Sequence, residues 1–261
     1  MHEVRTRAGS ASAAVDVTVP PRVTVGTETE ATLEIHGGTA DQAVDAVELS
    51  IQVGCRTPDG LDSVRVDQSA VAGPVTIHAT DRRTLGVPFE IPATAPLTFG
   101  GATAELAVTL DRGGAPDPGN PAATTGLEVG PSDRMQPVFD ALDDLGFRLR
   151  DAIPTRVATE PAGVPSAITQ RFRFEKSAGP FADALDGVVI GFDPGADALS
   201  VPVQPLSSGS DSTGGPGLET FSDPQSEPST DFAPVATLAV RETDPQAVMA
   251  DLRRLLAVVV E

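Results

Sequence analysis

The chain has 261 residues, with 37 acidic residues against 18 basic ones and a formal net charge of −19. This length is sufficient for two small domains, and the charge argues against a nucleic-acid-binding protein, because a phosphate backbone needs a basic surface. The sequence also has no Trp or Tyr, side chains on which nucleic-acid bases stack.

Lysine occurs once, at Lys176, every other basic residue is arginine, and Asp outnumbers Glu. An excess of short carboxylates with almost no lysine is what a protein in molar salt would carry. At an ionic strength of about 1 M the Debye length falls to about 3 Å, so that repulsion between surface carboxylates is screened. We therefore expect a halophilic protein from an archaeon that keeps salt in its cytoplasm.

The sequence contains one cysteine, Cys55, which is typical of a protein in a reducing compartment. No hydrophobic run reaches the length of about 20 residues that spans a bilayer. Residues 1–17 lack the apolar core of a signal peptide. We expect a cytoplasmic protein without a membrane span.

Alternation of apolar and polar residues dominates the first half and indicates half-buried antiparallel strands. Gly, Pro and Asp separate these segments, as in Gly37-Gly38 and Gly73-Pro74, and mark turns. Many short strands with such punctuation predict a β-sandwich. The alternating runs are 31–36, 47–54, 64–66, 75–77, 87–91 and 104–110.

Near Ser132 the period changes to that of a helix, predicted from about Asp133 to Leu145. Ser132 or Asp133 can cap its start, Pro137 is tolerated in the first turn, and Gly146 suits the left-handed residue that ends a helix. A loop is expected to extend to residue 165.

The second half returns to strands, predicted at 168–175, 188–192, 199–203 and 235–240. Residues 207–234 are rich in Ser, Gly, Pro and Asp, so we expect a disordered insertion there. The chain ends in a predicted helix, with Asp244 as cap and Pro245 at the first position.

These segments occur in an order that resembles the SpoOM (sporulation-control) family. The stretch from Phe139 to Leu149 is the most similar, and the insertion at 207–234 and Val25-Gly26-Thr27 depart from the family pattern. Further similar segments are Val15–Val17, Gly37–Leu49, Phe89–Thr98, Asp117-Pro118, Leu127–Val129, Phe172–Phe174, Gly179–Phe181, Leu185-Asp186 and Asp251–Leu255.

The resemblance implies a mainly β fold with two arrestin-like antiparallel sandwich domains, residues 1–132 and 133–261. One short helix would lie at their junction and another at the C-terminal end. It also implies no enzymatic activity and a regulatory or scaffolding role through protein–protein interaction.

The candidate site residues favour structural roles over catalytic, cofactor-binding or metal-binding ones. The three histidines are scattered, and Cys55 has no neighbouring base that would activate a thiolate. The segment Asp193–Asp197 lacks the ligand pattern of a calcium loop and predicts a turn. The histidines are His2, His36 and His78; Asp140, Asp143 and Asp144 fall on the polar face of the predicted helix.

The regularly spaced prolines Pro88, Pro92 and Pro96 could form a proline-rich ligand. Because Phe89, Ile91 and Leu97 alternate with them, a structural strand that crosses between sheets is the preferred interpretation.

The leading functional hypothesis is a non-enzymatic adaptor that binds other proteins, whose identity the sequence does not give. The alternatives are a ligand-binding or cryptic hydrolytic β-sandwich protein and an extracellular structural module. No cofactor and no small-molecule substrate are indicated by the sequence.

Overall fold

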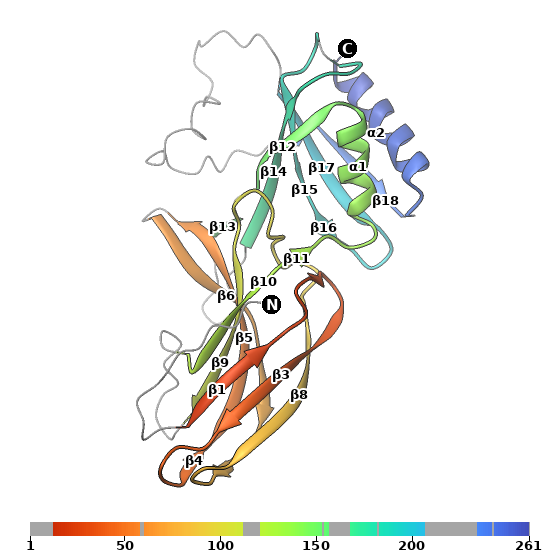
Figure 1. Cartoon of the computed structure of the whole chain (residues 1–261). Coiled ribbons are helices and arrows are strands. Elements are labelled where there is room, and N and C mark those ends of the chain that lie inside the picture. The colour runs from red at the N-terminus through yellow and green to blue at the C-terminus, as the bar shows by residue number, and fades with distance from the viewer. Residues whose placement is uncertain are drawn as a thin grey trace.

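The computed structural model describes residues 13–57, 60–111, 121–152, 154–156, 168–181, 183–206, 234–241 and 243–260. His2, Asp117-Pro118 and the predicted insertion at 207–234, apart from Pro234, lie outside these ranges. The chain forms two halves that follow one another along the long axis of the molecule (Figure 1).

The N-terminal half is a sandwich of two antiparallel sheets. One sheet has the order β1-β3-β8, and the other has the order β6-β5-β9-β10. Their bounds are β1 (Ala14–Thr18), β3 (Glu28–His36), β8 (Arg82–Glu90), β5 (Ala46–Thr57), β6 (Gly60–Ala72), β9 (Ala104–Asp111) and β10 (Ala123–Leu127). Two small pairs complete it: β2 (Val23–Thr24) with β11 (Val129–Gly130), and β4 (Gln42–Val44) with β7 (Val75–Ile77).

The core of this sandwich comes from alternate residues of the paired strands. Leu33 on β3 is buried, as are Leu49 and Ile51 on β5 and Leu106 on β9. Their polar neighbours point outward, because successive side chains of a strand lie on opposite faces. The predicted strands of the first half are confirmed.

The C-terminal half is an open sheet with two helices packed on it. Its strands follow the order β12-β14-β15-β17-β18, and β16 also pairs with β17. The bounds are β12 (Phe147–Asp151), β14 (Ile168–Lys176), β15 (Gly187–Gly191), β16 (Asp193–Pro194), β17 (Leu199–Leu206) and β18 (Ala236–Val240), with helices α1 (Gln136–Asp144) and α2 (Pro245–Val260). The helices lie side by side against the sheet (Figure 1).

The expected fold class, mainly β with one short helix at the junction and a second helix at the C-terminal end, is confirmed. In the second half, where the resemblance implied a sandwich, the described residues form one open sheet, and helices α1 and α2 cover it.

Helix α1 begins at Gln136, three residues after the predicted start at Asp133. The carbonyl of Ser132 accepts the N–H groups of both Met135 (2.9 Å) and Gln136 (3.0 Å), so residues 133–135 form a turn before the helix. No side chain caps this end. The predicted end is confirmed, because Gly146 has a φ of +88° in the left-handed region.

Helix α2 begins as predicted. The Asp244 carboxylate accepts the N–H of Gln246 at 3.1 Å, and Pro245 is the first helical residue. Pro245 lacks an N–H at a position where no helical acceptor exists for it.

Candidate functional site: the junction and the helix surface

A short strand joins the two halves into one hydrogen-bonded sheet. Strand β13 (Pro154–Arg156) pairs with β14 of the second half and, through Thr155 opposite Arg56, with β5 of the first half. The sequence predicted a loop here, and a strand of three residues is too short to show a periodic pattern.

Gln170 on β14 binds the proline-spaced segment with its side-chain amide. Its Oε1 accepts the N–H of Leu97 at 2.7 Å, and its Nε2 donates to the carbonyl oxygens of Leu97 (2.7 Å) and Ala152 (2.6 Å). All three contacts are partly buried, so these hydrogen bonds replace bonds that water would otherwise make. Sequence reasoning missed Gln170, because one glutamine in a strand gives no signal of a partner 73 residues away.

A cluster of phenylalanine rings adds an apolar contact between the halves. Phe99 follows the proline-spaced segment, and its ring packs against Phe139 of α1 with centroids 5.4 Å apart. Phe139 also contacts Phe172 and Phe192, at 5.2 and 5.3 Å. The pairs with Phe99 and Phe172 are edge-to-face, an arrangement that is favourable at these separations. Phe139 thus packs α1 against the junction, where the sequence predicted that this helix would lie.

Gly100 allows the close approach of the two halves. Its φ is +58°, and a Cβ atom there would lie 2.7 Å from the nitrogen of Ala152. Both the backbone conformation and the space therefore require glycine.

Two hollows lie beside this junction and share Ala93, Met135 and Pro194. One, of about 340 Å³, lies between the proline-spaced segment and β14, and the other, of about 420 Å³, is next to residues 24–27 and 132–135. Arg171 lines the first hollow, and burial there lowers its pKa. Pro96 is buried in its wall and Pro92 precedes it, whereas Pro88 lies in the edge strand β8.

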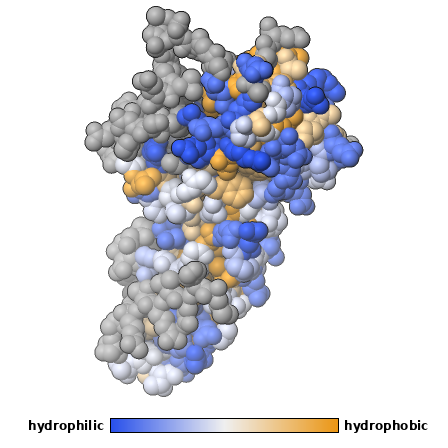
Figure 2. All heavy atoms as spheres, turned by 45° about the horizontal axis from the view of Figure 1, so that its top comes forward, coloured by the Kyte–Doolittle hydropathy of each residue, from blue (hydrophilic) through white to orange (hydrophobic). Residues whose placement is uncertain are grey.

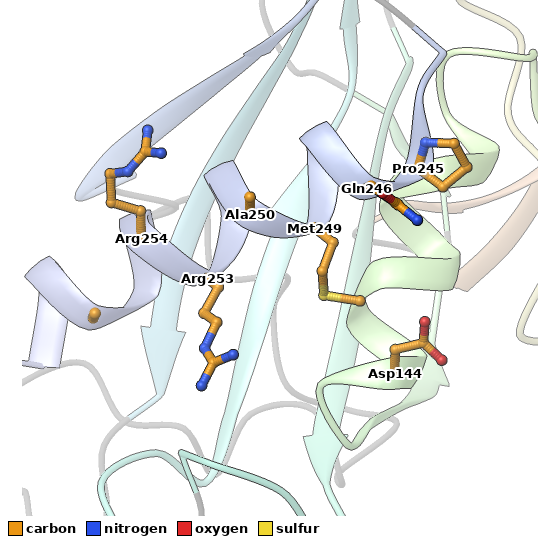
Figure 3. A pocket seen from close by; sticks show the side chains of 8 residues that line it. Asp144, Pro245, Gln246, Met249, Ala250, Arg253 and Arg254 are labelled. Carbon is orange, nitrogen blue, oxygen red and sulfur yellow. The ribbon is translucent and has the colours of Figure 1, made fainter.

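A third hollow, of about 590 Å³, lies on the helix surface between α1 and α2, and we name it the α1–α2 groove. Figure 3 shows Met249 reaching across it toward α1, with Asp144 and Arg253 on either side. The space-filling view in Figure 2 shows hydrophobic patches between hydrophilic side chains on this end of the molecule. The groove is lined by Asp144, Pro245, Gln246, Met249, Ala250, Arg253, Arg254 and Ala257.

The two described histidines lie apart, each beside carboxylates. His36 Nε2 is 3.3 Å from an oxygen of Asp16, and His78 Nδ1 is 3.0 Å from Asp41. The pKa of Asp41 is lowered, first by the hydrogen bond from the backbone N–H of Ala79 and then by His78. Within the described ranges, no three His, Cys, Asp or Glu side chains form a group that could hold a metal ion.

Cys55 is fully buried at the end of β5, and this burial raises the pKa of its thiol to about 11. Asp62 raises the pKa further, and Arg156 lowers it. The thiol is therefore protonated near neutral pH, and a protonated thiol is a poor nucleophile.

The remaining acidic candidates lie on the surface. Asp193 and Pro194 form β16, and Gly195 donates to the carbonyl of Ala198 at 3.1 Å, so this segment is the turn that was predicted. The carboxylates of α1 are exposed: Asp140 accepts a hydrogen bond from Gln136 at 2.7 Å, and Asp143 forms an ion pair with Arg148. No helix in the described part of the chain has both the length and the apolar character needed to cross a membrane.

Comparison with solved structures gives a likeness that extends over nearly the whole chain. The crystal structure of Spo0M, a sporulation control protein from Bacillus subtilis, aligns with a TM-score of 0.71 at 19% identity, over 96% of this chain and 98% of that one. The shared fold is therefore established along both halves.

Two other solved structures align over about half of this chain, each with a TM-score of 0.29. They are the CARDB domain of a Pyrococcus furiosus protein in complex with di-metal ions and a DNA-bound alkylpurine DNA glycosylase from Pseudomonas fluorescens. Their identities are 11% and 12%, over 49% and 46% of this chain and 95% and 30% of those chains. At this TM-score neither alignment supports an inference about this chain.

No curated protein has significant similarity to the sequence. The model of the SpoOM protein family, in contrast, matches residues 1–204, which is most of the chain. The order of segments from Val15 to Asp186, the two-part fold and this match lead to one conclusion: the chain belongs to the SpoOM protein family.

Proposed function

We propose that this chain is a non-enzymatic regulatory scaffold that acts by binding other proteins in a cytoplasm of high salt. The observation that carries the proposal is the junction, where Gln170, the phenylalanine cluster and β13 hold two halves in one frame. Such a frame presents surfaces from both halves to a partner at a fixed spacing.

The state of the most nucleophilic side chain supports a role without catalysis. The Cys55 thiol is buried and protonated at neutral pH, whereas a catalytic cysteine needs an accessible thiolate. His36, at the end of β3, and His78, directly after β7, each lie beside a carboxylate. Within the described residues, no hydrogen bond or ion pair connects either histidine to Cys55.

Strand β6 supports binding by strand addition. It has 13 residues, pairs only with β5 within the described part of the chain, and begins near Leu61, whose side chain is 79% exposed. A free strand edge can accept an extended segment of a partner. Asp62, Arg65 and Asp67 place charges along this edge, which disfavours unspecific pairing.

Two findings support the regulatory role that we propose: membership of the SpoOM family and the structural similarity to the Bacillus protein. The crystal structure that aligns with this chain is that of a sporulation control protein. We propose that this chain has a comparable controlling role, with a division into domains 1–132 and 133–261.

The experiment is a pull-down from extract of the source organism in molar KCl, followed by identification of the captured proteins. We expect one partner to be recovered reproducibly with the wild-type chain and lost with Leu61→Glu. Leu149→Glu is the matched control, since Leu149 is also an exposed leucine but lies on β12. Recovery of no reproducible partner would overturn the proposed function.

A further inference from the structure

The α1–α2 groove carries opposite charges on its two sides. Asp144, the last residue of α1, lies beside the first half of α2, and Arg253 lies further along α2 (Figure 3). Within the described part of the chain neither side chain has an ion-pair or hydrogen-bond partner. The neighbouring Arg254 differs, because Asp251 binds it at 3.0 Å.

The middle of the groove is apolar and lined by small side chains. Met249 is half-buried, Ala250 and Ala257 are exposed, and Val258 beside them is 68% exposed. Alanine on an exposed helix face lets a second helix approach closely, since the distance between packed helices depends on the side chains at the contact. Exposed valine and alanine side chains are then covered, which is favourable.

This arrangement is self-complementary. In a two-fold interface the same patch is used by both copies, so that residue i of one copy meets residue j of the other and the reverse. A groove with an unpaired carboxylate on one side, an unpaired guanidinium on the other and an apolar middle satisfies that condition. Its two charges cancel, whereas a chain of net charge −19 is repelled by its own copy over most of its surface.

We propose that the α1–α2 groove is the docking surface for a second copy of this chain. The two α2 helices pack antiparallel about an axis beside Ala250. Arg253, one turn beyond the axis, then faces the first turn of the partner's α2, where the partner's Asp144 lies. Two identical ion pairs flank an apolar centre that contains Met249 and Ala250.

A charge-swap experiment tests this arrangement by sedimentation velocity from micromolar to near-millimolar concentration. We expect the wild-type chain to dimerise. Asp144→Arg and Arg253→Asp alone each place like charges opposite one another twice per dimer, and we expect each to weaken dimerisation at least about tenfold. The double variant restores both pairs with reversed polarity, so we expect it to regain most of the affinity.

Asp140→Arg is the matched control for Asp144→Arg, because Asp140 is exposed on the same helix but does not line the α1–α2 groove. This control is expected to dimerise like the wild-type chain. A monomer at every concentration, single variants that dimerise normally, or a double variant no better than the single ones would each overturn the proposal.

A second measurement does not depend on the charge variants folding. In a Cys55→Ala background, Ala250→Cys places one thiol next to the proposed axis, where it meets its own copy. We expect mild oxidation to give a disulfide-linked dimer at low micromolar concentration. Ala239→Cys in the same background, an exposed alanine on β18, is expected to stay monomeric. Equal crosslinking of the two variants would also contradict the proposed axis.

Discussion

The side-chain amide of Gln170 takes the place of a peptide group at the junction. One amide plane accepts from and donates to the backbone of Leu97 and also donates to Ala152. Leucine has a similar volume without any polar atom, so Gln170→Leu removes the hydrogen bonds and keeps most of the packing.

We expect Gln170→Leu to lower the free energy of unfolding by about 2–4 kcal/mol, because three partly buried backbone groups lose their partner. Urea unfolding at fixed salt measures this. Gln136→Leu is the control, since among the described residues the Gln136 side chain makes one hydrogen bond, which is exposed and goes to Asp140 in α1. A loss for Gln170→Leu no larger than for Gln136→Leu would show that the amide does not hold the junction.

The Cys55 thiol predicts a loss of stability at alkaline pH. Burial raises its folded pKa from 9.0 to about 11. Because the folded state holds the thiol proton more tightly than the unfolded state does, the protonated thiol contributes to the free energy of unfolding. This contribution is fully present below pH 9.0 and is lost as the pH rises toward about 11, where the folded state also ionises. The sequence has no Tyr and one Lys, so few other side chains titrate in this window.

We expect the urea midpoint of the wild-type chain to fall across this window, and that of Cys55→Ala to fall less. Parallel curves for the two proteins would argue against a buried neutral thiol. The native thiol should also react slowly with a disulfide reagent until the chain is unfolded.

Helix α1 links the sheet of the second half to the junction through two side chains of different burial. Leu142 is fully buried, and Phe139 is partly buried within the phenylalanine cluster. We expect Leu142→Ala and Phe139→Ala each to cost about 2–5 kcal/mol, the range for removing large side chains from a core. Gln136→Ala on the exposed face of the same helix is the control, measured by the same urea titration. Losses below about 0.5 kcal/mol would mean that the helix is peripheral.

Strands β17 and β18 make the segment between them a candidate for deletion. They pair antiparallel, with Val203 opposite Ala236, so the chain leaves and re-enters the sheet at neighbouring positions. We expect replacement of residues 207–233 by a short Gly/Ser bridge to change the melting temperature by only a few degrees. A large fall would show that Phe221 or Phe232 contributes to the core.

How well each element could be predicted follows from the range of the interactions that form it. Alternating segments such as 31–36 and 104–110 and the end of α1 at Gly146 depend on neighbours in sequence, and they were predicted. The start of α1 was placed too early, because Ser132 and Asp133 are both good capping residues, while the structure uses the carbonyl of Ser132.

Elements that depend on distant partners could not be predicted. The strand β13 and the pairs β2–β11 and β4–β7 have two or three residues each, too few for a period to be visible. The Gln170 contact and the α1–α2 groove exist only after the halves and the helices have packed. The sequence placed the helix that contains Phe139 at the junction, but it gave no signal for Gln170 or for β13, whose partners lie far away along the chain.

At the scale of the whole molecule, the net charge of −19 opposes folding, because the compact state brings the carboxylates closer together. The carboxylates are spread over both halves, and the ion pairs that the structure forms, such as Arg82–Glu34 and Arg148–Asp143, are exposed. Exposed pairs contribute about 0–1 kcal/mol each. They do not offset the repulsion that 37 acidic residues against 18 basic ones produce.

We therefore predict that folding depends on salt. At about 0.1 M ionic strength the screening length is about 10 Å, which is longer than the distance between neighbouring surface charges, and at about 1 M it is about 3 Å. The melting temperature should rise steeply with KCl over this range, because added salt weakens the repulsion that opposes the compact state. The buried contacts of the sandwich core and of the phenylalanine cluster involve no charge, so salt leaves them in place.

Circular dichroism melts at several KCl concentrations measure the effect. Sodium chloride at equal ionic strength is the control, because screening depends on ionic strength and not on the identity of the cation. If potassium alone stabilised the chain, specific ion binding would be the cause and not screening. A melting temperature that stays flat or falls between about 0.1 and 2 M would contradict the halophilic interpretation. The near absence of lysine would then need another explanation, because its replacement by arginine and the excess of aspartate are the features from which the salt-rich habitat was inferred.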